Sequence, residues 1–62
     1  MENKVQLLKV EDVSKLLQIP IGSLYHMVNQ KKIPYIKIGK LVRFDPVEIE
    51  RWKLTKSVKV GV

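Results

Sequence analysis

The sequence contains no cysteine among its 62 residues. A chain of this length forms one small hydrophobic core, which neither a disulfide framework nor a thiolate metal site can supplement here. His26 is the only histidine, so a metal centre has no neighbouring imidazole or thiolate to draw on. We therefore expect a single domain that rests on packing, with no metal, no cofactor and no deep catalytic cavity.

Long apolar runs are also missing. No stretch approaches the ~18 apolar residues of a membrane span, and the start MENKVQLLKV lacks the apolar segment of a signal peptide. These absences predict a soluble, cytoplasmic protein without membrane contact.

Acidic residues are absent between Val13 and Phe44. This segment holds six cations: Lys15, Lys31, Lys32, Lys37, Lys40 and Arg43. The rest of the chain holds six cations and six acids, so the whole net charge of +6 arises in the middle. Such a concentration favours a polyanion as the partner, and a solvated cationic surface is the alternative.

Two helices are predicted first, at residues 10–17 and 21–30, with Pro20 in the turn between them. The apolar face of the first helix comprises Val10, Val13, Leu16 and Leu17. The second helix has an apolar face of Ile21, Leu24, Tyr25, Met27 and Val28, and a polar face of Gly22, Ser23, His26, Asn29 and Gln30. Pro34 prevents the second helix from continuing.

The segment YIKIGKLVRF, residues 35–44, predicts a two-stranded hairpin. A two-residue loop at 39–40 would mix its faces by placing Lys37 opposite Val42 and Ile36 opposite Arg43. A three-residue loop at 39–41 separates them, because it opposes Ile38 to Val42, Lys37 to Arg43 and Ile36 to Phe44. We favour this second register, with an anion between Lys37 and Arg43 to offset the repulsion of like charges. A solvated hairpin edge guarded by lysine is the alternative.

The segment DPVEIERWKL predicts a third helix. Asp45 suits the N-cap, Pro46 suits the first helical position, and Glu48 would complete a capping box. Ile49 and Trp52 are expected to close the core, so Trp52 is assigned to packing rather than to base stacking.

Together these elements predict a mainly α fold with a small β-hairpin, arranged as a winged helix-turn-helix. A tail at 1–6 and a flexible basic tail at 55–62 would flank the domain at 7–54. The chain also resembles the excisionase family of small MerR-like domains from about Leu7 to Leu54. The resemblance is carried by LLKVEDVSKLL, IPIGSLYHMV, KKIPYIKIGKLVRF and DPVEIERW.

The resemblance implies that the second helix enters a major groove of DNA while the hairpin, or wing, lies on an adjacent minor groove or on the phosphate backbone. Pro20, Ile21 and His26 depart from the Ser, Arg or Lys that are common in the family, and Lys9 replaces a Ser or Thr cap. The second helix, which would be the recognition helix, thus carries fewer positive charges than the corresponding helix of other family members. This favours modest sequence specificity, or specificity supplied by cooperative binding of neighbouring copies.

Candidate DNA-binding residues follow from this arrangement. On the recognition helix they are Ser23, Tyr25, His26, Asn29 and Gln30. The side-chain amides of Asn29 and Gln30 suit adenine, and His26 suits a phosphate or guanine. On the backbone-contacting side and the wing they are Lys31, Lys32, Lys37, Lys40 and Arg43. Tyr25 is expected either to pack its ring inward and offer its hydroxyl to a phosphate or to pack in the core alone. For the other residues an ordinary exposed side chain is the alternative.

The favoured function is therefore sequence-preferring binding of double-stranded DNA. The resemblance implies one of two roles. The protein would be an excisionase, which bends recombination sites for an integrase, or a small transcriptional regulator of a mobile element. The expected setting is the cytoplasm of a bacterial or phage-type system, in association with the nucleoid. Partners would be double-stranded DNA, an integrase or recombinase, and neighbouring copies, with no small-molecule substrate. The alternative is an adaptor whose basic wing and tail dock an acidic protein. RNA binding is weaker because aromatics are few, and an enzyme is disfavoured because no acid-base or nucleophile constellation is present.

Overall fold

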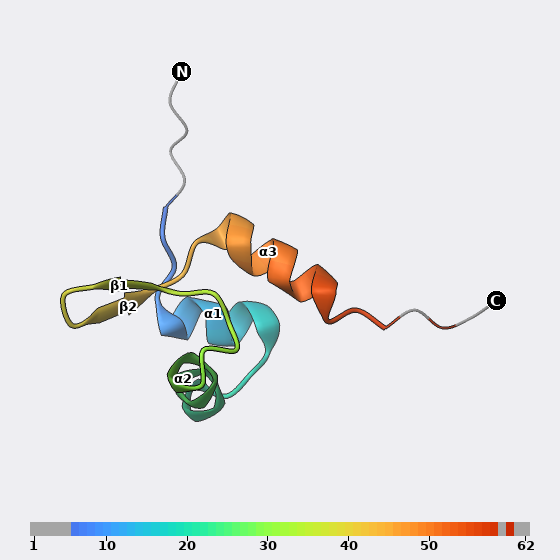
Figure 1. The fold of residues 1–62 in the computed structure, drawn as a ribbon, viewed down its shortest axis with the longest axis horizontal. Helices are drawn as coiled ribbons and strands as arrows, with labels where there is room; N and C mark the ends of the chain where they lie inside the picture. The colour runs from blue at the N-terminus through green and yellow to red at the C-terminus, as the bar shows by residue number, and fades with distance from the viewer. Residues whose placement is uncertain (1–5, 59, 61–62) are drawn as a thin grey trace, which may run out of the picture.

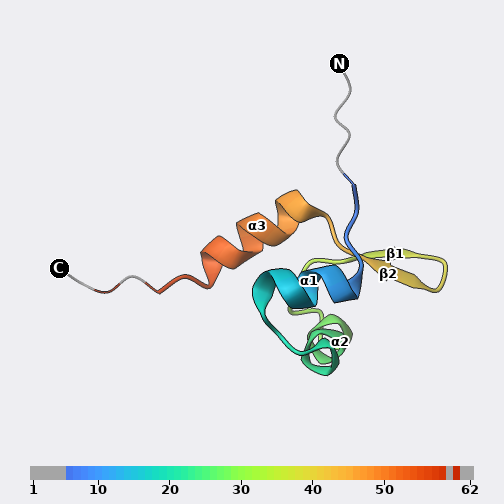
Figure 2. The same cartoon turned by 180° about the vertical axis from the view of Figure 1, so that it is seen from behind.

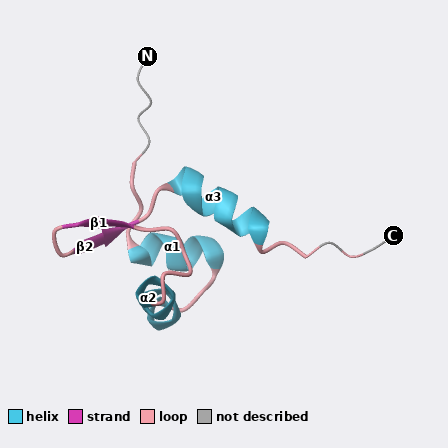
Figure 3. Ribbon diagram, in the orientation of Figure 1, coloured by secondary structure: helices cyan, strands magenta, loops and turns pink. Residues whose placement is uncertain are grey.

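The computed structural model describes residues 6–58 and 60. The elements are α1 (Val10–Leu17), α2 (Ile21–Asn29), β1 (Ile36–Ile38), β2 (Leu41–Arg43) and α3 (Pro46–Thr55). Figure 1 shows the hairpin of β1 and β2 projecting to one side of the three helices, and Figure 3 shows the same arrangement by type of element. The predicted winged helix-turn-helix is confirmed. Residues 1–5, 59 and 61–62, on which part of the two predicted tails falls, lie outside the described residues.

Hydrogen bonds from both side chains and backbone fix the two ends of α1. At its start the Asp12 carboxylate accepts a hydrogen bond of 3.0 Å from the backbone N–H of Lys9, whose own ammonium cannot act as an acceptor. At its end Gln18 adopts a left-handed conformation with φ 57°, and the N–H of Ile19 donates to the carbonyl of Ser14 at 3.1 Å. The Ser14 hydroxyl returns a bond of 2.6 Å to the Ile19 carbonyl. The turn that leads to α2 is therefore held from both sides.

The core gathers one or two side chains from each helix and from the segments around the hairpin. Its buried members are Val10, Val13, Leu24, Val28, Ile33, Phe44 and Ile49. Leu16 was expected among them but is 59% exposed. At roughly 100° per residue it points well away from the line through Val10, Val13 and Leu17, and an eight-residue helix has only one buried face.

Across residues 6–58 and 60, none of the helices is long and apolar enough to cross a bilayer.

The hairpin has the register that the sequence argument disfavoured. Ile36 pairs with Arg43, Lys37 with Val42 and Ile38 with Leu41, so the loop is Gly39-Lys40. Gly39 has φ 60° while Lys40 does not have a positive φ, which suits the type II′ turn of two-residue hairpins. The predicted three-residue loop was wrong because the turn conformation that glycine makes accessible outweighs the separation of apolar and charged faces.

A non-local bridge at the base of the hairpin explains the position of Phe44. Its backbone exchanges two hydrogen bonds with Leu8, at 2.8 and 2.9 Å, in an antiparallel bridge. The predicted pairing of Phe44 with Ile36 is wrong, because Ile36 pairs with Arg43 in the observed register and Phe44 bonds to Leu8 instead. Phe44 itself is fully buried and anchors the hairpin to the helices.

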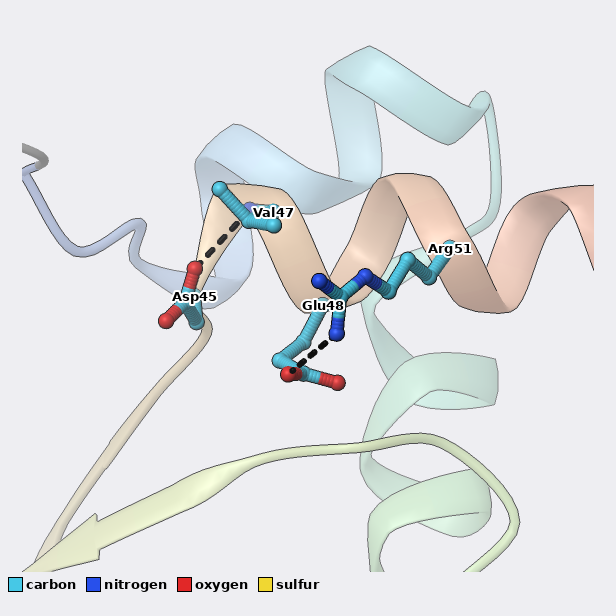
Figure 4. A network of polar contacts seen from close by, with 4 residues as sticks. All are labelled: Asp45, Val47, Glu48 and Arg51. Atoms are coloured by element: carbon cyan, nitrogen blue, oxygen red, sulfur yellow. Dashed lines mark hydrogen bonds and ion pairs between the residues drawn. The ribbon is translucent and has the colours of Figure 1, made fainter.

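The start of α3 is capped by one side chain rather than two. The Asp45 carboxylate accepts a hydrogen bond of 2.8 Å from the N–H of Val47, as expected for an N-cap. Glu48 does not complete the predicted capping box but lies 3.6 Å from the guanidinium of Arg51, one turn along α3 (Figure 4). The two residues are spaced as neighbours on one helical face, so the ion pair competes directly with the backbone for the carboxylate.

Candidate nucleic-acid interface

The outer face of α2 displays the five polar residues that the sequence singled out. Ser23, Tyr25, His26 and Asn29 lie on α2 and Gln30 at its C-cap, and all five side chains are exposed. The helix is held from the other side, where Leu24 is fully buried and Val28 is 6% exposed. The core thus fixes α2 while leaving a row of hydrogen-bonding groups free to meet a partner.

Tyr25 was expected either to pack inward or to divide its contacts between core and partner. Its side chain is 46% exposed, and it is absent from the buried core. Ile21, one turn earlier, is 40% exposed. The buried stripe of α2 is therefore narrower than the sequence pattern indicates, and Tyr25 belongs to the surface that faces the wing.

Lys31 and Lys32 follow α2 in a rigid turn. Lys31 is left-handed with φ 57°, its N–H donates to the carbonyl of Val28 at 3.0 Å, and the N–H of Lys32 donates to the carbonyl of Met27 at 2.9 Å. These two bonds form a Schellman motif, in which glycine is the usual residue at the position of Lys31. Both ammonium groups are exposed, so the motif presents two cations at the end of the polar face.

The wing, residues 36–43, carries its cations on different sides. Because successive side chains of a strand alternate, the observed register places Lys37 and Val42 on one face and Arg43 and Ile36 on the other. The predicted cationic face with Lys37 opposed to Arg43 was wrong. A thin hairpin with a cation on each face nevertheless matches a groove whose two walls are both anionic.

Arg43 is partly tied to its own strand. Its Nη1 donates a hydrogen bond of 2.9 Å to the carbonyl of Val42, and the side chain is half-buried. A guanidinium has five N–H donors in a fixed plane, so this bond orients the group and leaves donors for an anion.

A cleft lies between the wing, the start of α1 and α2. It has a volume of about 270 Å³ and is lined by Lys9, Val10, Glu11, Tyr25, Lys40, Leu41, Val42 and Arg43. Three of the predicted site residues, Tyr25, Lys40 and Arg43, therefore meet in one hollow. Three cations against one carboxylate give the hollow a net positive charge, which suits a phosphate oxygen.

Lys9 is the one cation lining this cleft that sequence reasoning did not assign to the site. The sequence indicates it only as an unusual N-cap of the first helix, in place of Ser or Thr. The Leu8–Phe44 bridge places the residue beside the outgoing strand of the wing, and a contact between segments so far apart leaves no periodic signal in the sequence. The positive charge at a helix start, where anionic residues are favoured, was the available hint.

Two helices joined by a tight turn, a projecting wing and a cleft of cations between them define a winged helix-turn-helix protein. The sequence model of the helix-turn-helix domain family matches residues 7–57, and the chain belongs to this family. It is thus a DNA-binding helix-turn-helix protein. No curated protein and no solved structure is detectably similar to the chain.

Proposed function

We propose that the protein binds double-stranded DNA with a preference for sequence, placing α2 in a major groove and the wing on an adjacent minor groove or on the phosphate backbone. The observation that supports this most strongly is the cleft in which Tyr25 of α2 meets Lys40 and Arg43 of the wing. One duplex lying across that cleft contacts the recognition helix and the wing at once, so base contacts and phosphate contacts reinforce each other.

Ser23, His26, Asn29 and Gln30 are the proposed readers of base edges, and Lys31, Lys32, Lys37, Lys40 and Arg43 the proposed phosphate contacts. Their exposure supports these roles. We add Lys9 to the phosphate contacts because it lines the same cleft. The protein would act by binding alone, without catalysis or cofactor.

In the cell this activity would serve excision, by shaping a recombination site for an integrase, or transcriptional control of a mobile element. The resemblance to MerR-like excisionase domains supports both, and the family to which the chain belongs favours either over an adaptor for acidic proteins. The expected setting is the bacterial or phage-type nucleoid, with neighbouring copies as further partners on DNA.

The decisive experiment is a titration of a labelled random duplex, followed by fluorescence anisotropy at four salt concentrations. The six proposed phosphate contacts predict a log-log slope of about −5.4. The double variant Lys37→Ala/Lys40→Ala should flatten the slope by about 1.8 units, since each phosphate contact contributes about 0.9.

Arg51→Ala/Lys53→Ala is the matched control, because it removes the same charge from α3. Both cations are paired there, with Glu48 at 3.6 Å and Glu50 at 3.2 Å. The proposal predicts nearly the wild-type slope for this variant. Equal flattening by both double variants would mean that only overall charge matters, and no binding of DNA at low salt would favour the acidic-protein adaptor instead.

A further inference from the structure

The tip of the wing carries two exposed apolar side chains beside the cation of its turn. Ile38 and Leu41 lie directly opposite each other beside the Gly39-Lys40 turn, and their side chains are 51% and 52% exposed. Figures 1 and 2 show the hairpin extending away from the helices, so this pair lies at its free end. Neither residue belongs to the core or packs against it. Exposed apolar side chains that are paired and placed on a projection are suited to a binding partner.

The cations around this pair restrict what the partner can be. Lys40 is part of the turn itself, Lys37 lies on one face of the wing and Arg43 on the other. An occupant that complements this arrangement has an apolar interior between two anionic walls. The minor groove of DNA fits, because stacked bases lie between two rows of phosphates.

We propose that the wing tip acts as an apolar wedge, with Ile38 and Leu41 entering the minor groove and opening a base step. The minor groove of B-DNA is roughly 6 Å wide, and two paired strands are already about 4.8 Å apart before their side chains are counted. The groove must therefore widen to admit the tip. Apolar wedges that do this partly unstack a base step and kink the duplex by roughly 20–90°.

This inference rests on the proposed DNA binding and deepens it in two ways. It assigns bending to two particular side chains, Ile38 and Leu41, rather than to the phosphate contacts along the backbone. It also predicts a preference at the position of the wing for pyrimidine–purine steps, which unstack most easily, although no hydrogen bond reads them.

The wedge is tested by ring closure of a linear duplex of about 150 bp, one persistence length, in which a bend brings the ends together. Wild-type protein should accelerate ligase-mediated closure by about tenfold or more, as expected for kinks of this size. Ile38→Ser/Leu41→Ser should lose most of the acceleration. Its salt slope should stay unchanged, because every cation is retained.

Leu16→Ser/Leu54→Ser is the matched control. These two residues are 59% and 63% exposed and lie on α1 and α3, outside the wing. The control should bend DNA as the wild type does. Circular dichroism of all three proteins checks that each is folded, and 2-aminopurine placed at a TA step should brighten with wild type and control but not with the wing variant.

The outcomes separate the wedge from DNA binding itself. A wing variant that binds and bends like the wild type overturns the wedge and leaves the proposed function standing. A wild-type protein that binds DNA without accelerating closure also overturns the wedge alone. If the wild type binds no duplex, both ideas fail, and binding to anionic lipid vesicles through the same two residues would assign the tip to a membrane surface instead.

Discussion

The indole Nε1 of Trp52 donates a hydrogen bond of 2.9 Å to the backbone carbonyl of Lys32. Trp52 lies in α3 and Lys32 in the connection between α2 and the wing, so the bond links α3 to the segment that positions both halves of the interface. The ring also packs against the core, as the sequence predicted.

We therefore expect Trp52→Phe to lower the free energy of unfolding by about 1 kcal/mol, because phenylalanine keeps most of the packing but leaves the carbonyl without this donor. Urea unfolding followed by circular dichroism measures the change. Leu54→Ala, on the same helix and 63% exposed, is the control and should stay within about 0.5 kcal/mol of the wild type. Equal stabilities of Trp52→Phe and wild type would show that the bond contributes nothing.

Arg43 and Asn29 should differ in what they contribute to DNA binding. Arg43→Ala removes a proposed phosphate contact, so affinity should fall to a similar extent for preferred and random duplexes and the salt slope should flatten by about 0.9. Asn29→Ala removes a proposed base contact and should cost about 1–3 kcal/mol of binding free energy at the preferred site only. The measurement is anisotropy with both duplexes. Arg51→Ala serves as the charge control, and parallel losses on every duplex from the Asn29 and Arg43 variants would contradict these separate roles.

The helices were predictable because their signals are local. Pro20 and Pro34 mark boundaries, Asp45 and Pro46 mark the start of α3, and apolar spacing marks the faces. The bounds of α1 agree with the prediction, and α2 ends at Asn29 with Gln30 as its C-cap. Each of these signals acts within one or two turns of helix, so no knowledge of the tertiary structure was needed.

The register of the wing was not predictable in the same way, because two local preferences conflict there. Alternation of apolar and basic residues favours a three-residue loop, whereas Gly39 favours a two-residue loop with a positive φ at its first position. The two-residue loop forms, and in the resulting register the apolar side chains of Ile38 and Leu41 are exposed at the tip of the wing. Here the separation of apolar and basic residues on the two faces of the hairpin is lost at an exposed projection. Such local departures from a folding pattern are typical of functional surfaces.

The contributions of Leu8 and Lys9 were beyond sequence reasoning for a different reason. Both residues gain their importance from the bridge between Leu8 and Phe44, which joins positions far apart in the chain. Lys9, the residue after Leu8, lines the same cleft as Lys40 and Arg43. The candidate site on α2 and the wing stays a prediction, and the place of Lys9 in the cleft with Tyr25, Lys40 and Arg43 was not foreseen.

Gly22 lies on the exposed face of α2 without a structural need for glycine. A Cβ atom added there would meet nothing within 4 Å, and its φ is not positive. Gly22→Ala should therefore raise the free energy of unfolding by about 0.5–1 kcal/mol, as expected in a helix. If α2 approaches DNA closely at this point, the same methyl group should weaken binding. Opposite signs for stability and affinity, measured by urea unfolding and anisotropy, would support the major-groove placement, whereas unchanged affinity would show that the duplex stays clear of Gly22.

Gln18 and Lys31 form a natural matched pair, since both adopt left-handed conformations with φ 57° at the ends of helices. Glycine at either position relieves the steric cost of a side chain there, so Gln18→Gly and Lys31→Gly should each stabilise the fold by about 1 kcal/mol. Only Lys31→Gly removes a cation from the proposed interface. Its salt slope should be flatter by about 0.9, whereas Gln18→Gly should bind DNA with the wild-type slope. Thermal unfolding and salt-dependent anisotropy on the same samples measure both effects. A stabilised Lys31→Gly protein with an unchanged slope would remove Lys31 from the phosphate contacts, because the gain in stability excludes a folding defect as the cause.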